Sequence, residues 1–180
     1  MVKNKNLAFI WWLTITASLG GLLFGYDTAV ISGTLSMVRS QFVLNAAMEG
    51  WYVSSALVGC VIGVSFAGWL SDKNGRKKVL ILAAILFTIS AIGCTFSNSF
   101  STLILYRMLG GMGVGIASML SPMYISEISP PKIRGRLVAL YQLAIAVGIL
   151  GSYFINAWLL NQSLGQEFFI SNKLTLVFKT

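Results

Sequence analysis

The chain has 180 residues, of which 56% are hydrophobic and only 10% are charged. Soluble domains typically carry about 25% charged residues, so this composition excludes an ordinary water-soluble globule and favours an integral membrane protein. The formal net charge is +8, but the basic residues are clustered between apolar segments, which argues against nucleic acid as a partner.

Five apolar segments are long enough to cross a hydrocarbon core of about 30 Å as helices. The first begins after Lys3 and Lys5, where a secretory signal peptide is the alternative. Because the apolar stretch continues to Gly33 with no polar mature segment behind it, a first membrane helix is favoured. The predicted spans, with ends defined to about two to four residues, are 7–38, 48–70, 79–96, 102–125 and 137–160.

Lysine and arginine gather in the connections on one side of these spans. They include Lys3, Lys5, the segment KNGRKK at 73–78 and three bases within 128–136. On the other side, the loops contain Arg39 alone. The positive-inside rule therefore places the N-terminus in the cytoplasm and predicts an all-α, multi-pass protein of the cell membrane.

The small residues indicate how the helices pack, and the absence of histidine limits the kinds of chemical site that the chain can form. GxxxG spacing predicts close helix packing at the pairs Gly21/Gly25, Gly59/Gly63 and Gly111/Gly115. The motif GGMGVG at 110–115 is only superficially like a dinucleotide loop, because no strand precedes it. Without histidine, and with only Cys60 and Cys94 inside apolar segments, the sequence predicts no metal site and no enzyme.

Two ionisable side chains, Asp27 and Arg107, lie inside the predicted spans. Each costs roughly 2.5–3.5 kcal/mol near a helix centre, so each needs a cavity or a partner. With a rise of about 1.5 Å per helical residue, Asp27 lies ~25 Å and Arg107 ~22 Å above the cytoplasmic boundary, so the two residues are expected at similar depths in the membrane. On the residues alone, a static ion pair and a pair that separates to let Asp27 take a proton are equal alternatives.

Two further residues suggest a polar cavity. Phe24 lies on the same helical face as Asp27, where an aromatic ring suits a stacking surface, although simple packing explains it as well. Gln142 is an amide in the fifth apolar segment, and it predicts either a helix–helix hydrogen bond or a substrate contact.

The chain resembles the sugar porters of the major facilitator superfamily, and most of all the bacterial proton-coupled symporters of xylose and related sugars. Four motifs carry the resemblance in family order: GGLLFGYDTAVISG at 20–33, GWLSDKNGRKK at 68–78, RMLGGMGVGIASMLSPMYISEISPPKIRGR at 107–136 and YQLAIAVGIL at 141–150. The resemblance covers roughly residues 7–160 and implies five helices of a six-helix N-terminal half.

The resemblance also implies proton-coupled transport of a hexose or pentose, with Asp27 as the proton acceptor and Arg107 as its partner. It implies no cofactor beyond the proton as coupling ion. Phe24 and Gln142 match sugar-binding positions, whereas Ile149 matches glucose-type carriers and leaves the sugar open. A cytoplasmic gate of salt bridges is implied for Asp72, Arg76, Lys77, Glu127, Arg134 and Arg136.

The alternatives are a facilitative sugar carrier without proton coupling and a non-transporting membrane module or defective product. The family continues with a sixth helix and a second six-helix half, whereas residues 161–180 contain none of its motifs. We therefore expect 161–180 to be a poorly ordered tail outside the family. We also expect a fragment that needs the missing C-terminal half for transport, with the lipid bilayer and a monosaccharide as partners.

Overall fold

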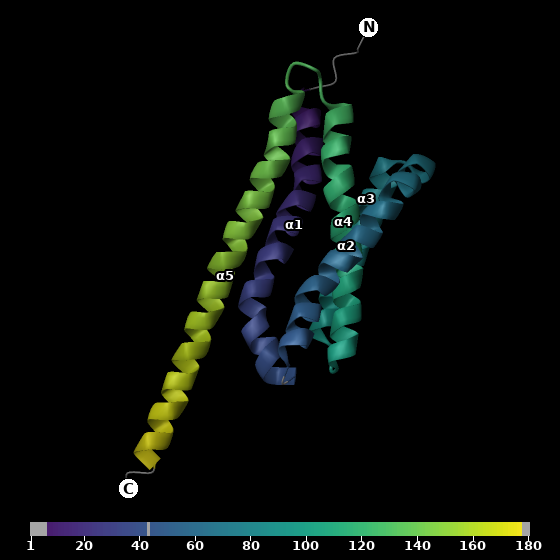
Figure 1. Cartoon of the computed structure of the whole chain (residues 1–180). Coiled ribbons are helices and arrows are strands. Elements are labelled where there is room, and N and C mark those ends of the chain that lie inside the picture. Colours follow the sequence, from purple (N-terminus) through teal and green to yellow (C-terminus); the bar gives the residue numbers. More distant parts are fainter. Residues whose placement is uncertain (1–6, 43, 178–180) are drawn as a thin grey trace.

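The computed structural model describes residues 7–42 and 44–177, which form five α-helices (Figure 1). Each helix is long and apolar enough to cross a membrane. In hydrocarbon the backbone must satisfy its own hydrogen bonds, which is why apolar segments of this length become helices. The helices are α1 (Leu7–Phe42), α2 (Ala46–Asn74), α3 (Arg76–Thr95), α4 (Phe100–Ile128) and α5 (Arg134–Val177).

The prediction of five membrane-spanning helices is confirmed, and each helix contains more residues than the span predicted for it. Hydropathy marks only the part of a helix that crosses hydrocarbon, whereas polar residues extend the helix beyond it, as at the end of α2. The difference is largest in α5, which continues past residue 160 to Val177 with no proline to stop it. No helix end marks the division into a transporter part, 1–160, and a tail, 161–180, and this division stays a prediction.

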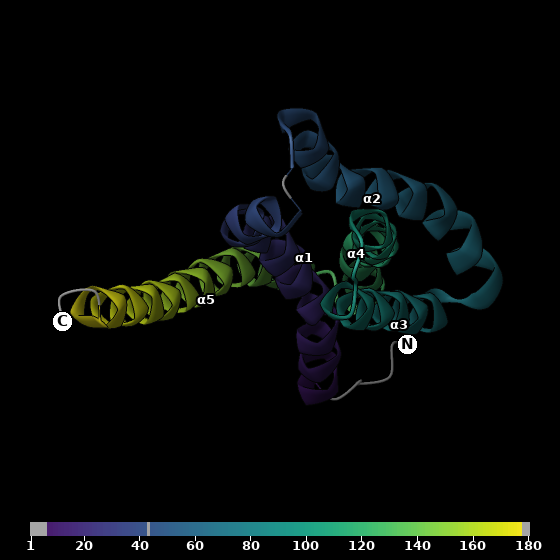
Figure 2. The ribbon, with the colours of Figure 1, turned by 90° about the horizontal axis from the view of Figure 1, so that it is seen from below.

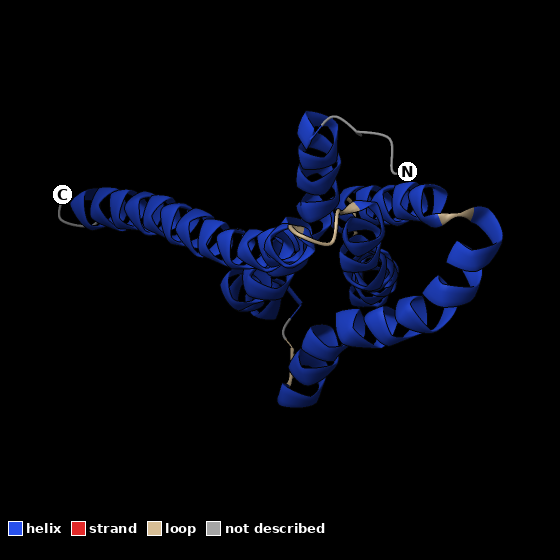
Figure 3. Cartoon of the chain, turned by 90° about the horizontal axis from the view of Figure 1, so that it is seen from above, coloured by secondary structure: helices blue, strands red, loops and turns tan. Residues whose placement is uncertain are grey.

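The helices pack as two close pairs, α1 with α5 and α2 with α4, and α3 lies against α4. Because α4 also contacts α1 and α5, it is the most buried of the five. Figures 2 and 3 show α5 extending away from the other helices toward its C-terminal end. Large apolar side chains such as Trp12, Trp69 and Phe154 are exposed, as expected for a surface in contact with lipid.

Glycines lie where two helix backbones touch. A Cβ added at any predicted GxxxG position would fall on backbone atoms of a facing helix: α5 for Gly21/Gly25, α4 for Gly59/Gly63 and α2 for Gly111/Gly115. Without a strong hydrophobic drive between helices in lipid, such close approach supplies the packing contacts that hold the pairs together. The predicted packing role of all three pairs is confirmed.

The connections between helices are short. Asn45 caps α2 by accepting a hydrogen bond from the Met48 N–H at 2.9 Å. Gly75 alone joins α2 to α3, with a φ of 84° that glycine adopts readily. The single Pro122 lies inside α4, whereas the helix ends at Ile128, shortly before the consecutive Pro130 and Pro131, because a residue that precedes proline is biased away from the helical conformation.

The start of α1, the α2–α3 turn and the α4–α5 connection lie toward one end of the bundle, which we name the N-terminal end (Figure 1). This arrangement brings the segments KNGRKK and 128–136 to the same end, as the alternation of five spans requires. Lys3 and Lys5 and residues 178–180 lie outside the described residues. A cytoplasmic location for this end stays a prediction.

Candidate functional site

Asp27 and Arg107 lie in the interior of the spans, on α1 and α4, two helices that contact each other. Both residues are half-buried, and Asp27 lies within range of the positive charge of Arg107. This proximity agrees with their matching depths. The ion pairs of the described residues do not include one between them, however. The structure therefore holds the two charges close without direct contact.

Arg107 binds Tyr52 of α2 instead. Its Nη1 donates a hydrogen bond to the Tyr52 hydroxyl at 3.3 Å, and its Cζ lies 4.5 Å from the centre of the Tyr52 ring. A cation over an aromatic face within about 6 Å is attracted by the ring quadrupole. The Nε and Nη2 atoms of Arg107 are buried, and within the described part of the chain they have no hydrogen-bond partner. Tyr52 thus binds the Nη1 side of the guanidinium, whereas the donors on Nε and Nη2 remain without a described acceptor.

The register of α2 on α4 explains this contact. The two helices run in the same direction. At Gly111 and Gly115 the backbone of α4 packs directly against the backbone of α2. Residues whose numbers differ by 55 face each other, in the pairs Ala56/Gly111, Cys60/Gly115 and Tyr52/Arg107. The same stripe of small residues that joins the helices therefore ends in the tyrosine–arginine pair.

Phe24 and Gln142 lie on the α1–α5 pair. Phe24 is half-buried, whereas Gln142 is exposed on α5. The two helices meet closely, because a Cβ at Gly25 would fall on the Ile145 carbonyl group. Gln142 makes none of the hydrogen bonds found among residues 7–42 and 44–177, so its amide is available for a group from outside this part of the structure.

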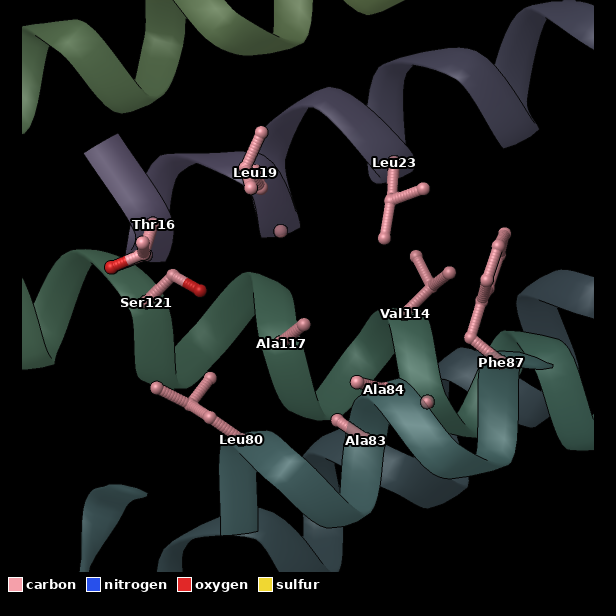
Figure 4. A pocket seen from close by; sticks show the side chains of 13 residues that line it. Thr16, Leu19, Leu23, Leu80, Ala83, Ala84, Phe87, Val114, Ala117 and Ser121 are labelled. Atoms are coloured by element: carbon pink, nitrogen blue, oxygen red, sulfur yellow. The ribbon is translucent and has the colours of Figure 1, made fainter. Parts of the chain in front are cut away.

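An apolar cavity of about 300 Å³ lies elsewhere, between α1, α3 and α4 (Figure 4). Leu23, Phe87 and Val114 supply apolar walls, and Ser121 is the polar group on α4 that borders it. Sugar hydroxyls need several hydrogen-bond partners, which such a lining does not offer. Asp27, Phe24 and Gln142 do not line this cavity, so it is not the predicted sugar site.

Arg76 joins three helices at the N-terminal end of the bundle. It stands at the start of α3 and binds Asp72 of α2, with Nη1 3.1 Å from Oδ1. Its Nη2 lies 2.9 Å from Glu127 Oε1 near the end of α4, and its Nη1 donates to the Ser71 hydroxyl at 2.7 Å. We name Asp72, Arg76, Glu127 and Ser71 the Arg76 cluster. Three of the six predicted gate residues are therefore brought together.

The other three predicted gate residues, Lys77, Arg134 and Arg136, are exposed. They take part in none of the ion pairs formed by the described residues. Lys77 borders a groove beside Phe9 and Tyr124, and the two arginines begin α5. The structure thus leaves these three positive charges on the surface of the N-terminal end.

Sequence reasoning missed Tyr52 and one ion pair. Arg39 Nε lies 2.6 Å from Glu49 Oε1 and links the end of α1 to the start of α2. Glu49 follows the N-cap of α2 by four residues, but no local signal tied it to Arg39. For Tyr52 a signal existed, because it continues the spacing of Gly59 and Gly63 along one face of α2. No group of metal-binding side chains occurs in the part of the chain that the structure describes.

Comparison with known proteins gives consistent matches. The family described as "Sugar (and other) transporter" matches residues 13–179, which include all of the predicted tail except its last residue. The arabinose-proton symporter of Bacillus subtilis is 47% identical over 156 residues, covering 87% of this chain and 34% of that one. The D-xylose-proton symporter of Escherichia coli is 42% identical over 182 residues, covering 87% and 37%.

Solved structures agree with these matches. A proton:xylose symporter of the major facilitator superfamily, bound to 6-bromo-6-deoxy-D-glucose, has a TM-score of 0.81 at 41% identity, covering 87% of this chain and 38% of that one. The inward open conformation of the Escherichia coli xylose transporter has a TM-score of 0.78 at 44% identity, covering 83% and 40%. The chain thus spans about a third of the length of the curated relatives it matches.

Proposed function

This chain belongs to the sugar transporter family, and from that premise we propose that it forms the N-terminal part of a proton-coupled monosaccharide symporter of the cell membrane. The family is one of transporters, so no enzymatic reaction is proposed. The observation that carries the proposal is the carboxylate of Asp27, inside a membrane span and near Arg107 without a direct ion pair. Relatives named for arabinose, xylose and galactose support a pentose or hexose as substrate.

Asp27 is the proposed proton acceptor. A carboxylate within a membrane span is stable when a nearby cation compensates its charge or when it carries a proton. Arg107 is close enough to act as that cation, yet its described hydrogen bond goes to Tyr52. Asp27 can therefore exchange one form of compensation for the other. The proton is the coupling ion in this proposal, and we assign no other cofactor.

The sugar is proposed to contact Phe24 and Gln142. Transporters of this kind bind substrate near the membrane midplane between two halves and alternate access by moving one half against the other. The exposure of Gln142 supports a contact with something outside the five helices. The rest of the sugar site would come from the C-terminal half that the curated relatives possess.

The Arg76 cluster is the proposed gate. It links the end of α2, the start of α3 and the end of α4, and in this proposal these three helix ends move together. Lys77, Arg134 and Arg136 are exposed beside it and are accessible to carboxylates of a second half. A carrier with two states needs only a modest difference in contacts to favour one of them.

The test uses a fused carrier, in which residues 7–160 of this chain replace the matched segment of the Bacillus subtilis arabinose-proton symporter. Cells without their own arabinose carriers express it, and labelled arabinose accumulation is measured together with alkalinisation of the medium. The 180-residue chain alone and the unmodified symporter are the controls. We expect the fused carrier to accumulate sugar, and its Asp27→Asn variant to retain sugar exchange while losing accumulation.

Each outcome bears on the proposal. Downhill uptake without alkalinisation would favour a facilitative carrier and overturn proton coupling. A fused carrier that reaches the membrane in normal amounts and moves no sugar would overturn the transport function. Accumulation by the 180-residue chain alone would overturn the need for a second half.

A further inference from the structure

We propose that Tyr52 is a positioning residue that holds Arg107 away from Asp27, and thereby sets when Asp27 is free to take a proton. The inference rests on the proposed proton coupling and assigns a role to a residue outside the predicted site. It is carried by the geometry of three side chains on α1, α2 and α4. In the described state the arginine is bound to the tyrosine and is not paired with the acid.

The contact between Tyr52 and Arg107 has two components. The guanidinium lies over the ring at 4.5 Å, and Nη1 donates to the hydroxyl at 3.3 Å. Both interactions are stronger in a dry site than in water, and Tyr52 is only 3% exposed. The hydroxyl also lies 3.3 Å from Thr34 Oγ1, which fixes the ring from α1. Tyr52 is therefore a buried partner for the arginine that also contacts α1.

The donors left over on Arg107 point to a second position. The buried Nε and Nη2 atoms have no partner among the described residues, which is costly, and a carboxylate is the acceptor that suits two donors of one guanidinium. Asp27 is the carboxylate within range of that charge. The remaining titratable side chains that interact with the pair are the thiols of Cys60 on α2 and Cys94 on α3, both free. Arg107 therefore has two alternative partners: Tyr52, which stays neutral, and Asp27, whose charge changes when it binds or releases a proton.

This arrangement couples the proton to the position of an arginine. When Asp27 is protonated its attraction for the guanidinium falls, and Arg107 rests on Tyr52. When Asp27 loses the proton, its negative charge competes for the two unpartnered donors and Arg107 shifts toward α1. The tyrosine hydroxyl balances that competition, so its loss favours the Asp27–Arg107 pair at the expense of protonation.

The critical variant is Tyr52→Phe in the fused carrier, because it keeps the ring and removes only the hydroxyl. Accumulation of sugar against a gradient requires proton uptake and release, whereas counterflow exchange of sugar requires neither to be completed. We expect accumulation to fall by about tenfold or more, the effect of losing one hydrogen bond to a charged group, with counterflow close to that of the parent. Thr34→Val, which removes the second partner of the hydroxyl, should change accumulation in the same direction by less.

Tyr106→Phe is the matched control. Tyr106 is adjacent to Arg107 in sequence, its ring packs against Gly93, and its hydroxyl makes none of the described hydrogen bonds. This variant should accumulate sugar like the parent, and the amount of each carrier in the membrane is measured alongside.

Three results would decide the matter. If Tyr52→Phe and Thr34→Val both accumulate sugar like the parent, the inference is overturned while the proposed function stands. If accumulation and counterflow fall together at equal amounts of carrier, Tyr52 is merely structural and the inference is overturned. If the parent itself fails to accumulate sugar, the proposed function fails first and the inference fails with it.

Discussion

The guanidinium of Arg76 lies 2.9 Å from the carboxylate of Glu127, and this contact joins the start of α3 to the end of α4. Arg76 also reaches Asp72 and Ser71 at the end of α2. One side chain thus connects three helices at the N-terminal end, next to the single-residue turn at Gly75. A link between helix ends matters most in a protein whose two states differ in which end is closed.

Replacing Arg76 with glutamine should slow the fused carrier. The glutamine amide cannot bind both carboxylates of the Arg76 cluster. The carrier state in which this cluster is formed therefore loses part of its stability relative to the other state. We expect the initial rate of accumulation to fall by about three- to tenfold, a modest shift in a two-state equilibrium. Lys78→Gln is the control, because it removes the same charge from an exposed side chain nearby. Equal rates for the two variants would show that only the total charge of KNGRKK matters.

The number of helices and their contact faces could be predicted from the sequence, because both depend on local patterns. An apolar stretch of span length must become a helix in lipid, whatever surrounds it. GxxxG spacing marks a face at which backbones can touch, and the structure puts α2 and α4 together at Gly59 and Gly111. The ends of the helices could not be predicted as well, because hydropathy gives no information about a helix beyond the hydrocarbon.

The partner of Arg107 could not be predicted in the same way. Depth is one coordinate of a residue in a membrane, and it brought Asp27 and Arg107 to the same level without fixing the directions of their side chains. Tyr52 carries no charge and looks like any aromatic residue in an apolar segment. Its contact depends on the register of α2 against α4, which the small-residue stripe implies only once the two helices are known to pair.

The Arg76 cluster came from the family resemblance alone. Arg76 and Glu127 are 51 residues apart, and no local spacing relates them. The resemblance named six gate residues, of which Asp72, Arg76 and Glu127 meet in the structure. The gate functions of all six stay predictions.

An alanine at Gly25 should destabilise the 180-residue chain. Its Cβ would fall on the Ile145 carbonyl of α5, where backbone cannot move aside without separating the two helices. We expect a loss of about 1–3 kcal/mol in the free energy of unfolding, as for other overpacked interiors. Thermal unfolding in lipid nanodiscs measures it. Gly151→Ala is the control, since a Cβ there meets nothing within 4 Å; a similar loss in both variants would contradict the packing role of Gly25.

Removing the hydroxyl of Ser90 should weaken the contact between α3 and α4. Ser90 Oγ donates to the Tyr106 carbonyl at 2.6 Å and is buried. Interhelical hydrogen bonds in membranes contribute ~0.6 kcal/mol on average, so Ser90→Ala should lower the unfolding free energy by about that amount. Ser65→Ala removes a hydroxyl that bonds only within its own helix, to Val61, and is exposed. The idea fails if Ser65→Ala proves at least as destabilising as Ser90→Ala.

The orientation of the chain can be tested with two matched glycines. Gly50 lies near the start of α2 and Gly135 near the start of α5, at opposite ends of the bundle, and an added Cβ meets nothing at either position. In a background with Cys60 and Cys94 replaced by serine, we expect Gly50→Cys to react with a membrane-impermeant maleimide in intact cells. Gly135→Cys should react only after the cells are opened, because the basic residues beside it favour the cytoplasmic side. The reverse labelling pattern would place the Arg76 cluster outside the cell, and a cytoplasmic gate there would then be impossible.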